Sequence, residues 1–568
     1  MISTRTAVRQ QAGRDQWIQR ILIGVMVVVL FVSVLLPLVV LYEKVFLDNE
    51  GNYVGLANLA KYFTTPALFQ SFTNTMFVSA VTTAISVTLA FLYAYALTRT
   101  AIPGKAFFRY AAMLPLFAPT MMHAIALQYL FGNQGLVTTG FFGSLAGFDI
   151  HLYGPVGIII SEVIYTFPQA FLVLSVSLAF ADYNLYEAAD TLGAGKARKF
   201  FTVTLPNIKY GLVSALFVCF TLSFTDFGAP KVVGGQYNVL ATDVYKHVIG
   251  QQNMTMGATV GLILIIPAIL AFIVDRIVER KQSASITAKS TPYKIVRQGW
   301  RDSLYLAYCL LITVLIFVLL LTVLFAALVK VWPYDLTLSL THFDFSKVAG
   351  EGMQPFWNSL LVSFYSAVIG TIITFVNAYL IEKTRFMKGL RQIGYFLSIL
   401  PLALPGLVIG LAFIFFFNNP DNPLNWMYGT VAIIVLANVV HFYSVPFISS
   451  TSALKKLDKE FDLASESMGV PFYKTFFRVT VPMSLPAILE NAVYFFINSM
   501  VTISAVVFLY SADFKLASVT IVNMDDAGDV APAAAMSVLI VLTNIIIRIV
   551  YELTTKGLRR RTEAWQKR

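Results

Sequence analysis

Residues 187–206, EAADTLGAGKARKFFTVTLP, recur 276 positions later as residues 463–482, LASESMGVPFYKTFFRVTVP. Gly193 matches Gly469, and Pro206 matches Pro482. Each copy is polar and lies between long apolar segments, so a duplicated membrane unit is expected to present the same contact element twice. Two matched contact elements predict a partner with two-fold symmetry.

The composition is that of a membrane protein. Of the 568 residues, 57% are hydrophobic and 12% are charged, whereas soluble proteins carry roughly 25% charged residues. A bilayer is spanned by about 20 apolar residues, and each half of the chain offers six such stretches. They are residues 21–42, 72–97, 108–130, 156–180, 212–227, 256–278, 304–331, 359–381, 393–417, 430–454, 485–509 and 533–551. The fold class predicted is an all-α membrane protein with twelve transmembrane helices.

The basic residues predict the orientation, because Lys and Arg concentrate in cytoplasmic loops. Both termini, alternate loops and the central linker hold all but seven of the 41 basic residues. Both termini are therefore expected in the cytoplasm. The net charge of +11 is explained by this pattern and by anionic membrane lipid, so no nucleic acid partner is expected. The first span is too long for a signal-peptide core and is expected to remain in the protein.

The duplication extends beyond the polar segments. Asn74 matches Asn358, and the run 114–119, LPLFAP, matches 400–405, LPLALP. Since six spans precede the second unit, the two six-helix repeats are expected to be parallel and related by an axis along the membrane normal. We expect a first permease domain at 1–280, a Ser- and Thr-rich cytoplasmic linker at 281–303 and a second domain at 304–568.

Each polar segment is expected to form a helix, a turn at Gly193 or Gly469, and a second short helix. The paired aromatics, Phe200 with Phe201 and Phe476 with Phe477, are not expected to face water. Either a partner covers them, or they pack under the bilayer face of their own chain.

The polar segment resembles the cytoplasmic motif of binding-protein-dependent permeases of ABC importers, which is similar to EAA, three residues, G, nine residues, I, one residue, LP. Here Glu187, Ala188, Ala189, Gly193 and Pro206 carry the resemblance. It implies the type I importer permease fold and a coupling helix that contacts an ATPase subunit. The implied partners are two ABC ATPase subunits and a periplasmic solute-binding protein, in a bacterial inner membrane.

The second copy departs from the motif. Leu463 replaces the glutamate, Ser465 replaces the second alanine and Val481 replaces leucine, while Glu466 lies opposite Asp190 and could supply an acidic contact. Glu466, Gly469 and Pro482 are the expected coupling residues of this copy. The two ATPase contacts are therefore expected to be unequal.

The fusion of two units resembles the iron(III) and phosphonate branch of these importers. Residues 225–235, TDFGAPKVVGG, followed by 239–258, VLATDVYKHVIGQQNMTMGA, are similar to permeases for 2-aminoethylphosphonate, which is the small-molecule substrate expected. Related ferric permeases contain a similar Asp-Phe-Gly stretch, so iron(III) is the alternative.

The chain lacks the residues for ATP hydrolysis. Residues 193–197, GAGKA, lack a glycine at the required spacing and the Ser or Thr that binds magnesium. No catalytic, cofactor or metal site is expected, and the chain is expected to be a non-catalytic subunit. An ion-coupled carrier would need buried titrating groups. The candidates, which are few and scattered, are Glu162, Asp226, Glu490, His123 and His441.

Polar residues near the ends of the fifth and eleventh spans are candidates for the solute pathway. They are Thr225, Asp226, Asn498 and Thr502. A weakly polar lining would let solute pass without holding it. On the outside, residues 511–530 carry Asp513, Asp525, Asp526 and Asp529 against Lys515 alone. This run would suit a basic surface on the receptor, or is simply solvated.

Overall fold

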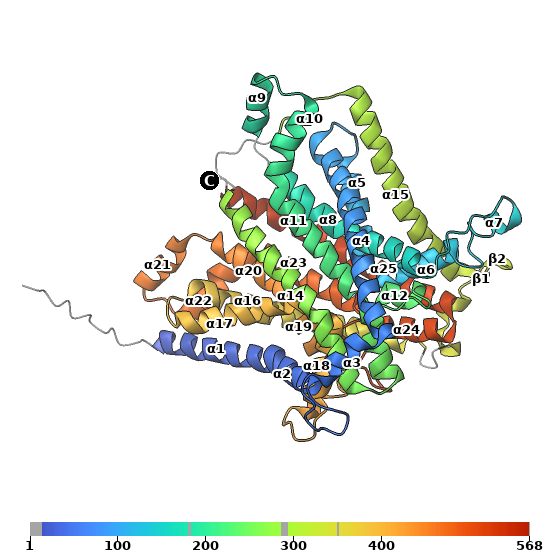
Figure 1. Ribbon diagram of the computed structural model, residues 1–568. Coiled ribbons are helices and arrows are strands. Elements are labelled where there is room, and N and C mark those ends of the chain that lie inside the picture. Colours follow the sequence, from blue (N-terminus) through green and yellow to red (C-terminus); the bar gives the residue numbers. More distant parts are fainter. Residues whose placement is uncertain (1–13, 180–182, 286–292, 349–351, 567–568) are drawn as a thin grey trace, which may run out of the picture.

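The computed structural model describes residues 14–179, 183–285, 293–348 and 352–566. Helices dominate these residues, and the described strands are one antiparallel pair, β1 (Val329–Val331) and β2 (Asp335–Leu338). Figure 1 shows helix α9 (Tyr183–Thr191) at the top of the view. The C-terminal end, α21 (Lys459–Ser467) and the start of α1 (Arg14–Leu30) follow one below another on the left. The β pair and α7 (Gly140–Gly143) lie on the opposite side of the molecule.

Twelve spans are present if each sharply bent helix pair is counted as one. Within the described residues, nine helical segments are long and apolar enough to cross a membrane, and three bent pairs also qualify. The spans of the first half are α1–α2 (Arg14–Leu30 and Leu36–Val45), α4 (Pro66–Arg99), α5–α6 (Lys105–Met113 and Thr120–Phe131), α8 (Pro155–Ala179), α11 (Leu205–Thr225) and α14 (Met254–Ser285). Those of the second half are α15 (Gly299–Leu328), α16 (Gln354–Lys383), α17–α18 (Lys388–Ile399 and Gly406–Phe417), α19–α20 (Val431–Phe442 and Ser444–Lys455), α23 (Val481–Val501) and α25 (Val530–Gln566).

The third span of each half is broken. The helices on either side meet at 99° in the first half and at 115° in the second. Each break lies at the repeated LPL motif and the proline that follows it, Pro119 or Pro405. Proline lacks the N–H that would continue the helix. Each of the spans predicted at 108–130 and 393–417 is therefore formed by two helices rather than one.

The eleventh span ends earlier than its apolar run. Helix α23 stops at Val501, and residues 502–516 are irregular, although 485–509 were expected to be helical. Val506, Val507 and Leu509 are nearly inaccessible. Hydropathy misplaced this boundary because chain buried inside the protein is as apolar as a lipid-facing helix.

The two halves exchange their first helices. Helix α1 packs against α16 and α17 of the second half, and α15 packs against α4, α5 and α6 of the first. The Tyr308 hydroxyl on α15 donates to the Leu89 carbonyl on α4 at 2.8 Å. The expected linker, of which 286–292 lie outside the described residues, therefore separates two sequence repeats whose helices interlock.

Matched hydrogen bonds support the internal duplication. The Asn74 amide donates to the Asn238 carbonyl at 2.9 Å, and its counterpart Asn358 donates to the Lys515 carbonyl at 3.0 Å. In both halves this bond ties the start of the second span to the irregular chain after the fifth. The matched asparagines therefore make the same contact, and have the same structural role, in each repeat.

Candidate coupling loops and solute pathway

The two polar segments fold into the same helix-turn-helix. Helix α9 leads into α10 (Lys196–Lys199), and α21 leads into α22 (Phe472–Thr475). Gly193 and Gly469 both have φ of +68°, which side chains rarely adopt. The N–H of Gly193 donates to the Asp190 carbonyl at 2.9 Å, and that of Gly469 to the Glu466 carbonyl at 3.1 Å. The glycine breaks expected from the sequence are present in both copies.

The remaining motif residues surround these turns. Glu187 and Ala188 are exposed on α9 and Ala189 is half-buried. Pro206 and Pro482 occupy the first turns of α11 and α23, where a missing N–H is tolerated. The structure thus brings all eight expected coupling residues into two matched loops.

The paired phenylalanines split between two roles. Phe200 packs against Phe91 on α4 with ring centroids 6.0 Å apart, and Phe476 packs against Phe375 on α16 at 5.9 Å. Phe201 and Phe477, in contrast, are 65% and 68% exposed. Packing against the chain itself is thus found for the first ring of each pair, and cover by a partner stays a prediction for the second. The first ring anchors the loop, and the second is presented outward.

Matched apolar residues project from each turn. Leu192 is 84% exposed, and its counterpart Met468 is 72% exposed. Each directly precedes the turn glycine. Exposed apolar residues at an end of a membrane protein rich in charge mark a contact surface.

Each loop is held by a basic residue at the end of the second span of its half, on α4 or on α16. These two basic residues were not identified from the sequence. The buried Arg99 guanidinium donates to the Leu178 carbonyl at 2.7 Å and lies over the Tyr186 ring of α9. Its counterpart Lys383 forms a 2.8 Å ion pair with Asp462 of α21. The repeats therefore attach their loops at the same place with different chemistry. The repeat offset of 284 residues could have paired these two side chains.

The two loops also differ in what covers them. The Tyr293 ring packs on Tyr186, and Lys294 lies 3.8 Å from the Glu187 carboxylate, so the end of the linker rests on the first loop. On the second loop, Asp15 of α1 accepts a 3.2 Å hydrogen bond from the Phe472 N–H. The loops are thus unequal in structure as well as in sequence.

Removing the Lys383 ammonium is expected to loosen α21. Lys383→Met leaves the partly buried Asp462 without its partner, which costs about 1–3 kcal/mol locally. Hydrogen exchange of the α21 amides should accelerate by about tenfold or more. The control is Lys455→Met, whose 3.9 Å contact with Glu382 involves a largely exposed ammonium. Equal exchange in both variants would contradict the tether.

All four candidate pathway residues lie at two adjoining hollows between the halves. One hollow of about 110 Å³ includes Asp226, Asn498 and Thr502, and another of about 220 Å³ includes Thr225, Asp226 and Asn498. Both also contain Tyr165, Gln169 and His441, which were not assigned to the pathway from the sequence. Tyr165 and Gln169 are four residues apart on the apolar helix α8, a polar stripe that could have indicated them.

Asp226 also has a structural role. Its carboxylate accepts a 2.9 Å hydrogen bond from the Ala229 N–H at the start of α12 (Gly228–Val233). Asp226 ends α11 as its counterpart Thr502 ends α23, with nearly identical backbone angles. The candidate pathway therefore passes the point where the fifth span of each half leaves helical geometry.

The gap beside these ends is closed by complementary small residues. A Cβ on Gly228 would lie 2.2 Å from the Thr120 hydroxyl, and one on Gly406 would lie 2.3 Å from the Ser504 hydroxyl. Thr120 starts α6 and contacts a glycine, whereas Gly406 starts α18 and contacts a serine. Each half therefore pairs one glycine with one hydroxyl residue, but the broken third span supplies the hydroxyl in the first half and the glycine in the second. These close approaches hold the broken third spans against the pathway.

The titratable candidates fall into separate groups. Glu490 pairs with Arg548 at 2.8 Å, and His123 is buried on α6. The Glu162 carboxyl, buried on α8, interacts with that of Asp226 but does not line the two hollows. Only Asp226 and His441 of this set line them. Among the described residues, no group of three His, Cys, Asp or Glu side chains is placed to hold a metal ion.

An ion pair joins the halves on the side opposite the loops. Lys231 of α12 lies 2.6 Å from Asp526 of α24 (Ala517–Ala527). The acidic run 511–530 was expected to face a receptor or water, and Asp526 is exposed while it also links the two repeats. The neighbouring Asp525 is half-buried. Loss of hydration, followed by repulsion from Asp526, raises the pKa of its carboxyl from 3.8 to about 6.

This raised pKa predicts a pH dependence. Because the folded protein disfavours ionised Asp525, stability should fall as the pH rises from about 4 through about 6. Asp525→Asn should flatten that change and raise the Tm at pH 7.5, while Asp529→Asn serves as a nearby control with the same loss of charge. Thermal unfolding in detergent across pH 4–8 measures both. An unchanged profile in Asp525→Asn would contradict the assignment.

Comparison with known proteins identifies the class of protein that this fold and these loops define. The family model described as "Binding-protein-dependent transport system inner membrane component" matches twice, at residues 86–284 and 370–560. The chain belongs to this family, with the duplicated helical architecture of type I ABC importer permeases. It is therefore a multi-pass membrane protein.

Several curated relatives match most of the chain. The ferric transport system permease protein FbpB of Actinobacillus pleuropneumoniae is 28% identical over 550 residues, covering 94% of this chain and 78% of the relative. The putative ferric transport system permease protein FbpB 1 of Haemophilus influenzae is 27% identical, covering 86% and 78%. The molybdenum transport system permease protein ModB of Escherichia coli is 30% identical over 27% of this chain and 66% of its own length.

Proposed function

We propose that this chain is the membrane-spanning permease subunit of an ATP-driven importer for iron(III). The observation that carries the proposal is the match of nearly the whole duplicated chain to ferric permeases. None of the relatives named above supports 2-aminoethylphosphonate, the cargo first expected from residues 225–258. The alternative cargo inferred from the same stretch, iron(III), agrees with these relatives.

The coupling step follows from the two loops. Two ATPase subunits would bind the chain, one at each loop, with Leu192 and Phe201 or Met468 and Phe477 entering the contact. Phe200 and Phe476 pack on α4 and α16, so a displacement of either loop would be passed to a span of its own half. The chain itself needs no ATP site for this role.

The pathway fits passage rather than storage of a cation. Asp226, Tyr165 and His441 line the two hollows, and carboxylate oxygen is a suitable hard ligand for iron(III). The Asp226 carboxylate, the Tyr165 hydroxyl and the His441 imidazole come from separate helices and would offer a passing cation weak, transient contact. The Lys231–Asp526 pair joins the two halves at the opposite end, as expected for a stage of transport at which the outside is shut.

The proposed orientation places the loops, the start of α1 and the end of α25 in the cytoplasm of a bacterium, with the Lys231–Asp526 pair facing the periplasmic receptor. The positive-inside distribution of Lys and Arg supports it. Cysteine accessibility at Leu192 and at Tyr334, an exposed residue near the β pair, tests it. Labelling of Leu192→Cys from the outside of intact cells would reverse the assignment.

The cargo is tested by direct competition. Cells that express the chain with its neighbouring ATPase and receptor should accumulate labelled iron(III), and excess unlabelled 2-aminoethylphosphonate should leave this uptake unchanged. Uptake of labelled 2-aminoethylphosphonate without iron uptake would retain the importer class and overturn the proposed cargo.

A further inference from the structure

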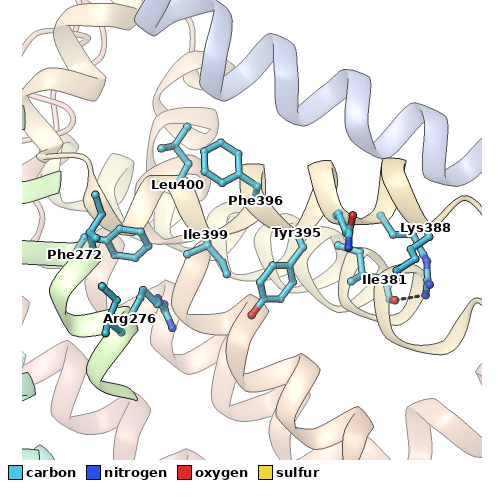
Figure 2. A pocket seen from close by; sticks show the side chains of 12 residues that line it. Phe272, Arg276, Ile381, Lys388, Tyr395, Phe396, Ile399 and Leu400 are labelled. Carbon is cyan, nitrogen blue, oxygen red and sulfur yellow. Dashed lines mark hydrogen bonds between the residues drawn. The ribbon is translucent and has the colours of Figure 1, made fainter. Parts of the chain in front are cut away.

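A long hollow runs between α14 of the first half and α17 of the second. It has a volume of about 620 Å³, and its walls are mainly apolar, with contributions from Phe272, Tyr395, Phe396, Ile399 and Leu400. Figure 2 shows Arg276 toward one end of this hollow and Lys388 toward the other, with Tyr395 between them. The hollow is separate from the candidate pathway, since the two share no lining residue of those described.

The hollow opens on a face of the protein that contacts lipid. Ile266, Leu270, Ile273 and Ile277 are each about half exposed. Their spacing places them on one side of α14, and α14 is a membrane-spanning helix. Phe396 of α17 is 61% exposed beside them. The apolar part of the hollow is therefore surrounded by the acyl chains of membrane lipid, and one of these chains can fill it.

The polar part of the hollow is basic. Arg276, Lys388 and Arg391 line it, and among the side chains that the structure describes no acidic one does. Arg276 directly follows the apolar span Met254–Val274, and Lys388 lies five residues after Lys383, which is tied to the coupling loop. These cations therefore lie at the loop end of the membrane, at the level of lipid headgroups. Arg391 also donates to the Ile381 carbonyl at 2.9 Å, which fixes its position at the wall.

The internal duplication matches Arg276 with an arginine of the second half. The run 276–278, RIV, recurs as 548–550. Arg548 is held by Glu490 and Glu552, each at 2.8 Å. The positions that match these two carboxylates are occupied by Ser214 and Arg280. The two halves therefore place different side chains around their matched arginines at these two positions.

We infer that this hollow binds an anionic phospholipid, with the headgroup phosphate near Lys388 and Arg391 and an acyl chain along Tyr395, Phe396 and Leu400. Each Lys or Arg near a membrane surface adds to the binding of anionic lipid. A lipid in this place would contact both halves of the permease at once. It would thereby link their relative movement to the composition of the membrane, whatever the cargo is.

Native mass spectrometry of the purified full-length protein tests this inference, with phosphatidylglycerol and phosphatidylcholine as probes. The unmodified protein should retain phosphatidylglycerol in preference to phosphatidylcholine. Arg276→Gln combined with Lys388→Gln should weaken phosphatidylglycerol binding by about tenfold or more. Arg391 is left in place because its hydrogen bond to the backbone supports the fold. Equal retention of both lipids by the unmodified protein would overturn the requirement for an anionic headgroup.

Two further variants separate the site from general charge effects. Gln392→Glu places a carboxylate at an exposed lining position and should also weaken binding without removing a contact. Lys209→Gln combined with Lys456→Gln removes two charges outside the hollow and should leave binding unchanged. If the control variant lost as much lipid as the Arg276 and Lys388 variant, or if Gln392→Glu bound normally, the location would be wrong.

Discussion

Replacement of Gly193 by proline should abolish most transport while the protein remains inserted in the membrane. Gly193 has φ of +68°, whereas proline is fixed near −65°. The substitution also removes the N–H that bonds to the Asp190 carbonyl. Helices α9 and α10 would then lose their relative angle, and the exposed Leu192 would no longer be presented to the ATPase. We expect at least a tenfold fall in ATP-dependent uptake, about the effect of 1.4 kcal/mol or more.

The duplication supplies a control two residues away. Gly195 has φ of −65° and ψ of 166°, and its counterpart in the second loop is Pro471, with φ of −58° and ψ of 142°. Gly195→Pro should therefore be tolerated, because the backbone already has the required geometry. Gly469→Pro should resemble Gly193→Pro. Normal uptake by both Gly193→Pro and Gly469→Pro would show that these loops do not couple the ATPase to transport.

Substitution of Asp226 has the second large expected effect. Asp226→Ala removes both the hydrogen bond to the Ala229 N–H and the carboxylate that faces the two hollows. Asp226→Asn keeps an acceptor for the hydrogen bond and removes only the charge. If the carboxylate contacts passing iron(III), uptake by Asp226→Asn should fall by about tenfold, as expected for the loss of roughly 1.4 kcal/mol of contact.

Receptor-stimulated ATPase activity distinguishes the two roles of Asp226. It should remain near normal in Asp226→Asn and fall in Asp226→Ala, where the start of α12 is disturbed. Normal uptake in Asp226→Asn would make Asp226 a helix cap only. Normal uptake and ATPase activity in both variants would remove it from the pathway.

Periodic and local features were predictable from the sequence. Length and hydropathy identified the spans, the repeat offset identified the two loops, and Gly193 and Gly469 indicated the turns. Each of these signals depends on residues that are close in the chain. The four polar residues chosen near the ends of the fifth and eleventh spans are also brought by the fold to the two hollows.

Features that depend on tertiary packing were not predictable. The apolar run 485–509 was assigned wholly to a helix because burial by protein and burial by lipid select the same side chains. The motif LPL was recognised as a repeat, but its bend of about 100° was not. The Lys231–Asp526 pair joins residues almost 300 positions apart, and nothing in the local sequence indicates that Asp526 has this partner.

The most direct test is uptake of labelled iron(III) in cells that contain the chain, its receptor and either an active or a catalytically inactive ATPase subunit. The account predicts uptake only with the active ATPase. Uptake that persists with the inactive ATPase would contradict it, and would instead indicate a carrier driven by an ion gradient.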